Sequence, residues 1–329
     1  MNDVSQVRPE NVCTEFRVSV VVPCRDRASQ LEVCLSAVSR LDPPPAEVIV
    51  VDSYSRSGDA VREVAIRNSA RYLRVESPGL SLARNVGSRS AAGNIIAFLD
   101  DDAVPARDWL LHLVRPFIDP HVGCVTGRVE APPDALDGRE CELLGYVRGY
   151  NSPTSISIED ANWFEAACFG GIGIGPNLSI RKSIFSEWTG FCERLGLGTS
   201  ILGNEEGYAF LELIRLGYTI KYASGALVTH PVPMPERTIL QRRYHTNLAA
   251  STAFLLMLIF EESGCRWRAL KYLLGKLGKI STLWSRGKRP QGARLIPGWH
   301  VTLARASGLL CYSRSLATLV RNKRNSRSA

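Results

Sequence analysis

The sequence predicts an α/β fold in which a doubly wound, mostly parallel sheet is followed by a basic helical C-terminal appendage. Three observations indicate this arrangement. Apolar, β-branched runs alternate with segments of helical periodicity through the first third of the chain, as in parallel sheets with crossover helices. Aspartates follow three of the predicted strands, and the excess positive charge of the chain lies near its C-terminus.

The first predicted elements alternate strictly in type. The run FRVSVVVPCRDR is apolar over 17–23 and then polar, which predicts a buried strand that leads into a surface loop. Beyond it we expect a helix over 28–40, a strand over 47–51, a helix over 60–68, a strand over 72–75, a helix over 81–92 and a strand over 95–99. Strand–helix–strand repeats of this kind join parallel neighbours.

The middle of the chain continues the scaffold with fewer signals. Apolar residues at helical spacing predict a helix over 109–117, and strands are expected over 122–129 and 226–229. The polar stretch 132–160 is interpreted as a mobile loop over the site. The glycine-rich run 170–175 does not open a helix after a first strand, so we interpret it as a place where substrate approaches the backbone rather than as a dinucleotide site.

Composition limits the class of protein. The chain has 329 residues, of which 45% are hydrophobic and 22% charged, so one large α/β domain with an appendage is expected. Its nine cysteines contain no CxxC pair, which disfavours a zinc site and indicates a reducing compartment. The N-terminal 1–16 carries acids and no apolar core, so it does not resemble a secretory signal. These features predict a cytoplasmic protein.

The charge of the C-terminal region points to a surface partner. Residues 263–329 contain 15 Lys or Arg and no Asp or Glu. Such a segment suits nucleic acid or an anionic membrane. The sequence around it favours the membrane. The apolar stretch 248–260 is too short for the roughly 18–20 residues of a spanning helix, so we interpret it as a core or interfacial helix. We expect peripheral binding to the inner face and no nucleic-acid partner. The alternative is a basic helical cap that packs on the main domain.

Three consecutive carboxylates, Asp100, Asp101 and Asp102, follow the predicted strand 95–99. In open α/β sheets this edge binds ligands, and clustered carboxylate oxygens suit Mg²⁺ or Mn²⁺ with positions left open for phosphate. Arg84 on the preceding helix could supply a guanidinium to a diphosphate. The alternative is an exposed acidic turn, which the buried strand directly before the triplet disfavours.

Several motifs together resemble the family 2 glycosyltransferases. SVVVPCRDR resembles the first strand and nucleotide loop of that family, EVIVVDSYSRSGDA its second strand, and GLSLARNVGSRSAAGNIIAFLDDDA its Arg-Asn-x-Gly helix and aspartate motif. ACFGGIGIGPNLSIRKSIF and GNEEGYAFLELIRLGYTIKYASGALVTH resemble its acceptor region and acidic catalytic motif. The resemblance implies a nucleotide-diphospho-sugar transferase fold over a catalytic domain at 17–236, between an N-terminal tail at 1–16 and the basic, helical region at 237–329.

The same resemblance implies roles for individual residues. Asp52 would contact the donor base, Arg84 the diphosphate, and Asp102 the metal. The implied donor-binding residues are Pro23, Arg25, Asp26, Asp52, Arg84, Asp100 and Asp101, and the implied ligands of Mn²⁺ or Mg²⁺ are Asp102, Asp100 and His230. Ser53 and Ser57 stand where the family more often has acids, which leaves the nucleotide open.

The pair Glu205-Glu206 opens a predicted helix that Asn204 would cap and Gly217 would end. Adjacent helical residues point about 100° apart, so one of the pair can face an acceptor hydroxyl. The order of the resembling motif makes Glu206 the general base. The alternative is that both carboxylates only complement the helix dipole.

The resemblance thus implies an inverting, metal-dependent transferase. It would move one sugar from a nucleotide-diphosphate sugar to a hydroxyl of a saccharide or lipid-linked acceptor, in cell-surface polysaccharide or glycolipid synthesis. The alternative from another class is a non-catalytic nucleotide-sugar-binding or regulatory protein that docks through its basic tail. A nucleotidyltransferase is disfavoured because the loop after the first strand, VVVPCRDRAS, lacks glycines.

Overall fold

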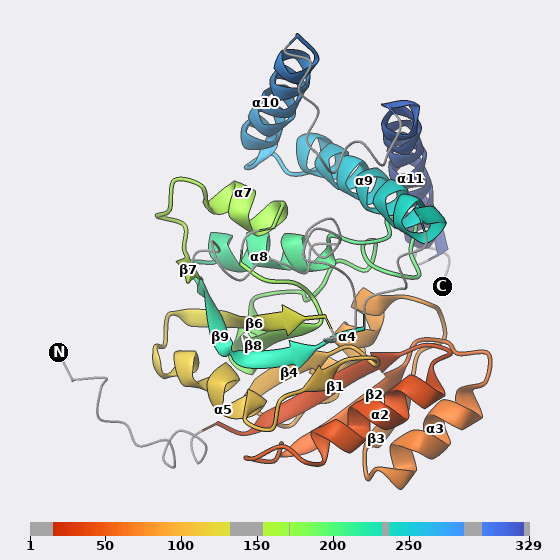
Figure 1. The fold of residues 1–329 in the computed structure, drawn as a ribbon, viewed down its shortest axis with the longest axis vertical. Helices are drawn as coiled ribbons and strands as arrows, with labels where there is room; N and C mark the ends of the chain where they lie inside the picture. The colour runs from red at the N-terminus through yellow and green to blue at the C-terminus, as the bar shows by residue number, and fades with distance from the viewer. Residues whose placement is uncertain (1–15, 132–153, 171, 232–236, 286–297, 326–329) are drawn as a thin grey trace, which may run out of the picture.

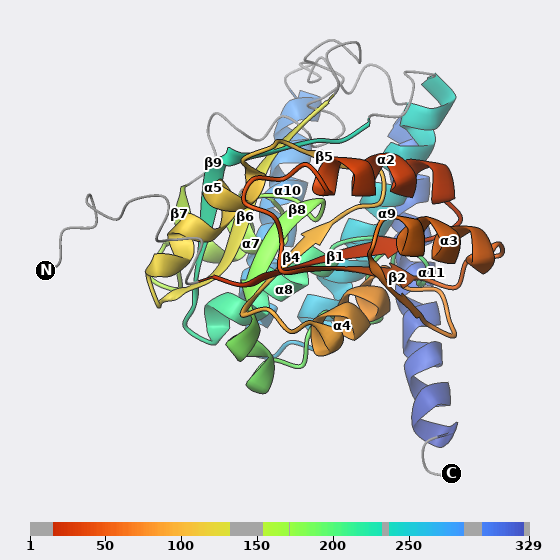
Figure 2. The same cartoon turned by 90° about the horizontal axis from the view of Figure 1, so that it is seen from below.

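The computed structural model describes residues 16–131, 154–170, 172–231, 237–285 and 298–325. The predicted N-terminal tail, apart from Phe16, and most of the predicted loop over 132–160 lie outside the described residues. A sheet occupies the centre of the structure, and helices cover both of its faces (Figures 1 and 2).

The described strands form one nine-stranded sheet in the order β3-β2-β1-β4-β8-β6-β9-β5, with β7 paired to β9. Their bounds are β1 Val18–Cys24, β2 Glu47–Asp52, β3 Arg71–Arg74, β4 Ile95–Leu99, β5 Val104–Pro105, β6 Val122–Glu130, β7 Ser155–Ile156, β8 Asn177–Arg181 and β9 Thr219–Thr229. Strands β3, β2, β1 and β4 are parallel, as predicted. Strand β8 enters antiparallel between β4 and β6.

The helices divide between the two faces, so the predicted doubly wound α/β fold is confirmed. Their bounds are α2 Ala28–Val38, α3 Gly58–Arg67, α4 Leu80–Ser90, α5 Trp109–Val114, α7 Trp163–Cys168, α8 Glu205–Arg215, α9 Arg237–Phe260, α10 Arg266–Ser285 and α11 Gly298–Asn325, with short 3₁₀ turns at Arg115–Ile118 and Lys182–Ser186. Apolar residues of α2, α3 and α5 pack in one core, and those of α4, α7, α8 and α9 pack in a second core on the opposite face.

The predicted strand at 95–99 matches β4, whereas the predicted strand at 226–229 is only the last part of β9. The first part of β9 lacks an apolar run because most of its side chains are half-buried or exposed. Sequence pattern therefore missed it, and the pairing with β6 reveals it.

The C-terminal helix α9 packs against the α/β part of the chain. Helix α9 buries the apolar stretch that the sequence assigned to a core or interfacial helix, including Phe254 and Leu258. Two carboxylates at its end tie it to the rest of the molecule: Glu261 pairs with Arg194, and Glu262 accepts a hydrogen bond from Tyr208. Among the described helices, none combines the length and apolar character required to cross a bilayer.

Candidate functional site

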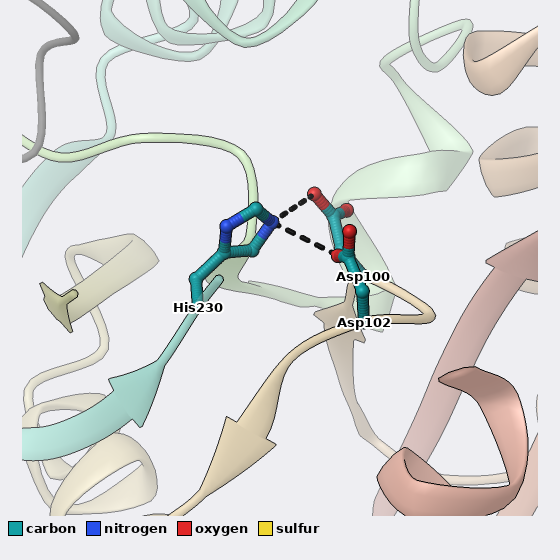
Figure 3. Close-up of side chains that lie close together, drawn as sticks. All are labelled: Asp100, Asp102 and His230. Atoms are coloured by element: carbon teal, nitrogen blue, oxygen red, sulfur yellow. Dashed lines mark ion pairs between the residues drawn. The ribbon is translucent and has the colours of Figure 1, made fainter. Parts of the chain in front are cut away.

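The aspartate triplet and His230 meet because of one strand pairing. Strand β5 starts two residues after Asp102 and runs antiparallel to the end of β9, with Val104 opposite Thr229. This register sets His230, the residue after β9, beside the turn that carries Asp100 and Asp102 (Figure 3). The ring Nε2 of His230 lies 3.0 Å from Asp102 Oδ1 and 3.7 Å from Asp100 Oδ2.

These three side chains fit a divalent cation. Their candidate ligand atoms all lie within 4.8 Å of one another. The Nδ1 of His230 lies 3.0 Å from the carbonyl oxygen of Pro231, which can only accept, so Nδ1 carries the hydrogen of that bond. When the ring is protonated, its Nε2–H donates to the carboxylates; when it is neutral, Nε2 presents the lone pair that a cation held by the three side chains would bind. Metal-ligating histidines are commonly fixed in this way by a backbone carbonyl.

The charge on Asp100 is stabilised from two sides. Burial alone would raise the pKa of this carboxyl group, but the hydrogen bond from His230 and the charge of Arg84 hold the pKa below its usual value. Asp100 is thus ionised at neutral pH, which is the form that a metal binds.

Asp101 and the nearby arginines form the other side of the turn. Arg27 Nη1 lies 3.1 Å from Asp101 and 2.8 Å from Asp102, and the backbone N–H of Arg25 donates to Asp101 at 3.4 Å. Burial raises the pKa of Asp101 to about 6, and the charge of Arg27 opposes that shift. The sequence analysis did not single out Arg27. The sequence feature that could have identified Arg27 is its position in the polar loop directly after the first strand.

Arg84 is buried between the triplet and the glutamate pair, with 1% of its side chain exposed. Its Nη1 lies 3.1 Å from Glu205 Oε1, and its Nη2 lies 3.5 Å from Asp100 Oδ1 and 3.3 Å from the carbonyl oxygen of Gly175. The guanidinium also lies over the ring of Phe191. Its charge is thus paired with carboxylates within the protein.

The rest of the Arg-Asn-x-Gly motif explains the position of α4. The side chain of Asn85 accepts from the backbone N–H of Phe191 at 2.8 Å and donates to its carbonyl oxygen at 2.9 Å. Gly87 packs directly on the sheet, since a Cβ atom there would lie 2.4 Å from Val21 Cγ1. Gly87 therefore lets α4 pack closely on β1, and Asn85 holds the loop at Phe191 against α4.

The two predicted nucleotide contacts nearest the first strands differ in exposure. Asp52 is fully buried: its Oδ1 accepts from the backbone of Ser55, and its Oδ2 accepts from Tyr72 and Arg74, each at 2.7 Å. Both oxygens are therefore engaged within the protein, and Pro23 is buried as well.

Asp26 is exposed at the loop after β1, in the left-handed region with φ 56°. Its backbone N–H donates to Ser55 Oγ at 2.9 Å, and its Oδ1 accepts from the backbone of Arg56 at 2.7 Å. The loops after β1 and β2 are therefore joined, while the side chain of Arg25 stays exposed beside them.

The acidic pair opens α8 as predicted, but its two members face different surroundings. Glu205 is 5% exposed and pairs with Arg84, while its Oε2 is buried without a hydrogen-bond partner among the described residues. Burial, and then the charge of Glu206, raise the pKa of Glu205. Asn204 precedes the helix in the left-handed region with φ 65° and makes no side-chain cap, so the predicted capping hydrogen bond is wrong.

Glu206 lines a cavity of about 590 Å³ instead. Residues from the glycine-rich run, Gly170 and Gly173, lie along the same cavity, as do Asn247 of α9 and Arg305 of α11. The sequence analysis missed the residues of the C-terminal helices because no motif marks them. Only packing shows that these helices reach the glutamate pair.

The sequence of this chain matches one family model and several known proteins. Residues 19–188 match the model of the glycosyl transferase family 2. The glycosyltransferase AglE of Haloferax volcanii is 26% identical over 313 residues, which cover 90% of this chain and 95% of that protein. The pre-mycofactocin glycosyltransferase of Mycobacterium tuberculosis is 32% identical over 233 residues, which cover 69% of this chain and 45% of that protein. The chain therefore spans less than half the length of this second relative.

Solved structures share the fold. The mannosyltransferase of Pyrobaculum calidifontis in complex with GDP-Man and Mn²⁺ has a TM-score of 0.56 at 20% identity, covering 92% of this chain and 87% of that one. Mannosyl-3-phosphoglycerate synthase from Rubrobacter xylanophilus has a TM-score of 0.52 at 18% identity, covering 78% of this chain and 80% of that one. These likenesses confirm the predicted nucleotide-diphospho-sugar transferase type of α/β fold.

Proposed function

This chain belongs to glycosyl transferase family 2, and we propose that it moves one sugar from a nucleotide-diphosphate sugar to an acceptor hydroxyl with inversion at the anomeric carbon. The observation that carries this proposal is the convergence of Asp100, Asp102 and His230 at the carboxyl edge of parallel strands. Nucleotide ligands bind at this edge in α/β sheets. The mannosyltransferase structure that holds GDP-Man and Mn²⁺ shares this fold.

We assign Asp102, Asp100 and His230 as the residues that would hold Mn²⁺ or Mg²⁺. When bound, such an ion supplies positive charge that stabilises the diphosphate as it leaves. Arg27 lies against the same carboxylates, so its guanidinium is also within reach of an anion at this edge. Exposed Arg25 and Asp26, with Asp100 and Asp101, are the proposed donor contacts. The buried Pro23, Asp52 and Arg84 would support the donor loops from behind.

Glu206 is the proposed general base, because it lines the cavity whereas Glu205 is turned into the protein onto Arg84. The carboxylate of Glu206 would accept the proton of the acceptor hydroxyl as its oxygen attacks the anomeric carbon and the bond to the nucleoside diphosphate breaks. Glu205 would hold Arg84 and so orient the start of α8.

We further propose that the protein works in the cytoplasm on the inner face of the membrane, in synthesis of a cell-surface polysaccharide or glycolipid. This is supported by 15 basic residues and no acid beyond position 262. It is also supported by apolar side chains that the C-terminal helices leave exposed, such as Trp267 at 74% and Trp299 at 63%. Tryptophan and basic residues together favour an anionic bilayer surface.

The test is a panel of nucleotide sugars, each measured for thermal stabilisation and for slow hydrolysis of the donor, with and without Mn²⁺. We expect one nucleotide class to stabilise the protein in the presence of Mn²⁺ and to be hydrolysed. Stabilisation without turnover under any condition would support a non-catalytic binding protein instead. Full activity in the presence of a chelator would contradict the metal assignment.

A further inference from the structure

The C-terminal helices form one side of the cavity that Glu206 lines. One side of it consists of the start of α8 and the glycine-rich run, which belong to the catalytic half. The facing side consists of Leu248 and Leu255 of α9, Tyr272 and Leu273 of α10, and Arg305 of α11. The proposed base therefore faces a surface that the family motifs do not include.

Helix α11 is held close to α9 by small residues. Ala304 and Gly308, one helical turn apart, are both buried. A Cβ atom on Gly308 would lie 2.6 Å from Thr252 Cβ and 2.7 Å from the carbonyl oxygen of Ala249, so the two helix backbones approach closely at this point. Arg305 follows Ala304 directly, and this contact fixes it at the cavity.

The side of the cavity that faces Glu206 is lined mainly by apolar side chains and carries one cationic side chain, that of Arg305. Glu206 and Arg305 are the only charged side chains among the described residues that line the cavity. No described carboxylate lies within ion-pair distance of Arg305, and no Asp or Glu occurs after position 262. A half-buried guanidinium beside leucines and a tyrosine suits a ligand that presents an anionic oxygen next to an apolar chain.

Resting on the function proposed above, we infer that this cavity is the acceptor site and that it takes a phosphate-linked lipid. Its hydroxyl would face Glu206, its phosphate would pair with Arg305, and its apolar chain would lie against Leu248, Tyr272 and Leu273. The same helices α10 and α11 expose tryptophans on the outside, so such an acceptor could enter from a membrane on which they rest. Arg305 would then be the residue that selects an anionic acceptor.

The probe is decyl phosphate below its micelle concentration, compared with decyl glucoside as a neutral chain and inorganic phosphate as a free anion. Calorimetry on the full chain should show that decyl phosphate binds more tightly than either. Arg305→Ala should weaken decyl phosphate binding about 10-fold or more, since a charge-assisted hydrogen bond is lost, and Arg305→Lys should retain most of it. The matched control is Arg314→Ala, which removes an exposed arginine of the same helix that does not line the cavity.

Equal affinity for decyl phosphate and decyl glucoside, or an equal loss in the Arg305→Ala and Arg314→Ala variants, would overturn the inference. Circular dichroism and the Arg305→Lys variant separate a folding defect from loss of the contact. Binding of inorganic phosphate alone, with no gain from the decyl chain, would also overturn the lipid assignment. Donor hydrolysis by the unmodified protein tests the proposed function separately, because it requires no acceptor.

Discussion

The Nη1 atom of Arg84 lies 3.1 Å from Oε1 of Glu205, which joins the helix of the Arg-Asn-x-Gly motif to the helix that carries the glutamate pair. The other nitrogen of the guanidinium reaches Asp100 at 3.5 Å. One buried cation therefore connects the proposed metal ligands with the start of α8. Its loss would leave two carboxylates without their shared partner.

Replacing Arg84 with methionine should destabilise the protein by about 3–5 kcal/mol, because removing one member of a buried ion pair leaves the other charge uncompensated. Urea unfolding followed by circular dichroism measures this change. The control is Arg62→Met on the exposed side of α3, which should change stability by less than about 0.5 kcal/mol. Equal effects of the two substitutions would show that the Arg84 contacts carry no net stabilisation.

Asp102→Asn should keep the fold and lose most metal-dependent activity. The substitution removes a negatively charged ligand oxygen but preserves the size of the side chain. Donor hydrolysis across a Mn²⁺ titration, with melting temperature as the check on folding, measures the effect. Asp59→Asn on exposed α3 is the control. An Asp102→Asn enzyme with an unchanged Mn²⁺ response would remove this residue from the site.

Glu206→Gln should bind the donor normally and turn over about 10²–10⁴ times more slowly, the usual cost of losing a positioned base. Glu205→Gln should lose much less turnover but some stability, because it weakens the pair with Arg84. Turnover and donor affinity of both variants are compared side by side. A dead Glu205→Gln beside an active Glu206→Gln would reverse the assignment, and two active variants would mean that the pair only opens the helix.

Gly87→Ala should destabilise the protein by about 1–3 kcal/mol, because the added methyl group would overlap Val21 on β1. Thermal unfolding measures the change. Gly275→Ala on α10 is a matched control, since a Cβ there meets nothing within 4 Å. The free energy of unfolding of this control should rise by up to about 1 kcal/mol, because alanine has a higher helix propensity than glycine. A gain at both positions would contradict the close packing of α4 on the sheet.

The full chain should sediment with anionic vesicles and release at high salt, since each basic residue near the surface contributes about 1 kcal/mol. Replacing Trp267 and Trp299 with serine should reduce sedimentation. Ile66→Ser, which changes a 60% exposed apolar residue on α3, should not. Equal, salt-insensitive sedimentation with neutral and anionic vesicles would contradict this docking.

Local sequence patterns were sufficient to predict the core of the fold. The parallel strands β1, β2 and β4 are apolar runs followed by polar loops, and these three and β3 were each located to within one or two residues. The triplet Asp100–Asp102 and the pair Glu205-Glu206 were found because neighbouring residues predict the strand before the triplet and the helix that begins at the pair.

What the sequence could not provide depends on contacts between distant segments. Arg84 was expected at a diphosphate, but only the packing of α4 against α8 shows its charge paired with Glu205. The same is true of buried Asp52, whose partners Tyr72 and Arg74 come from the neighbouring strand.

The pairing of Val104 with Thr229 has a consequence for how the molecule assembles. Asp100 and Asp102 lie in the first third of the chain. His230 comes beside them only when β9, the last of the described strands in the chain, pairs with β5. Contacts between such distant segments form late, because closing a long loop costs entropy before any contact repays it. If the proposed site binds a divalent ion, its affinity reports completed folding, since a chain with β9 undocked holds two of the three proposed ligands together.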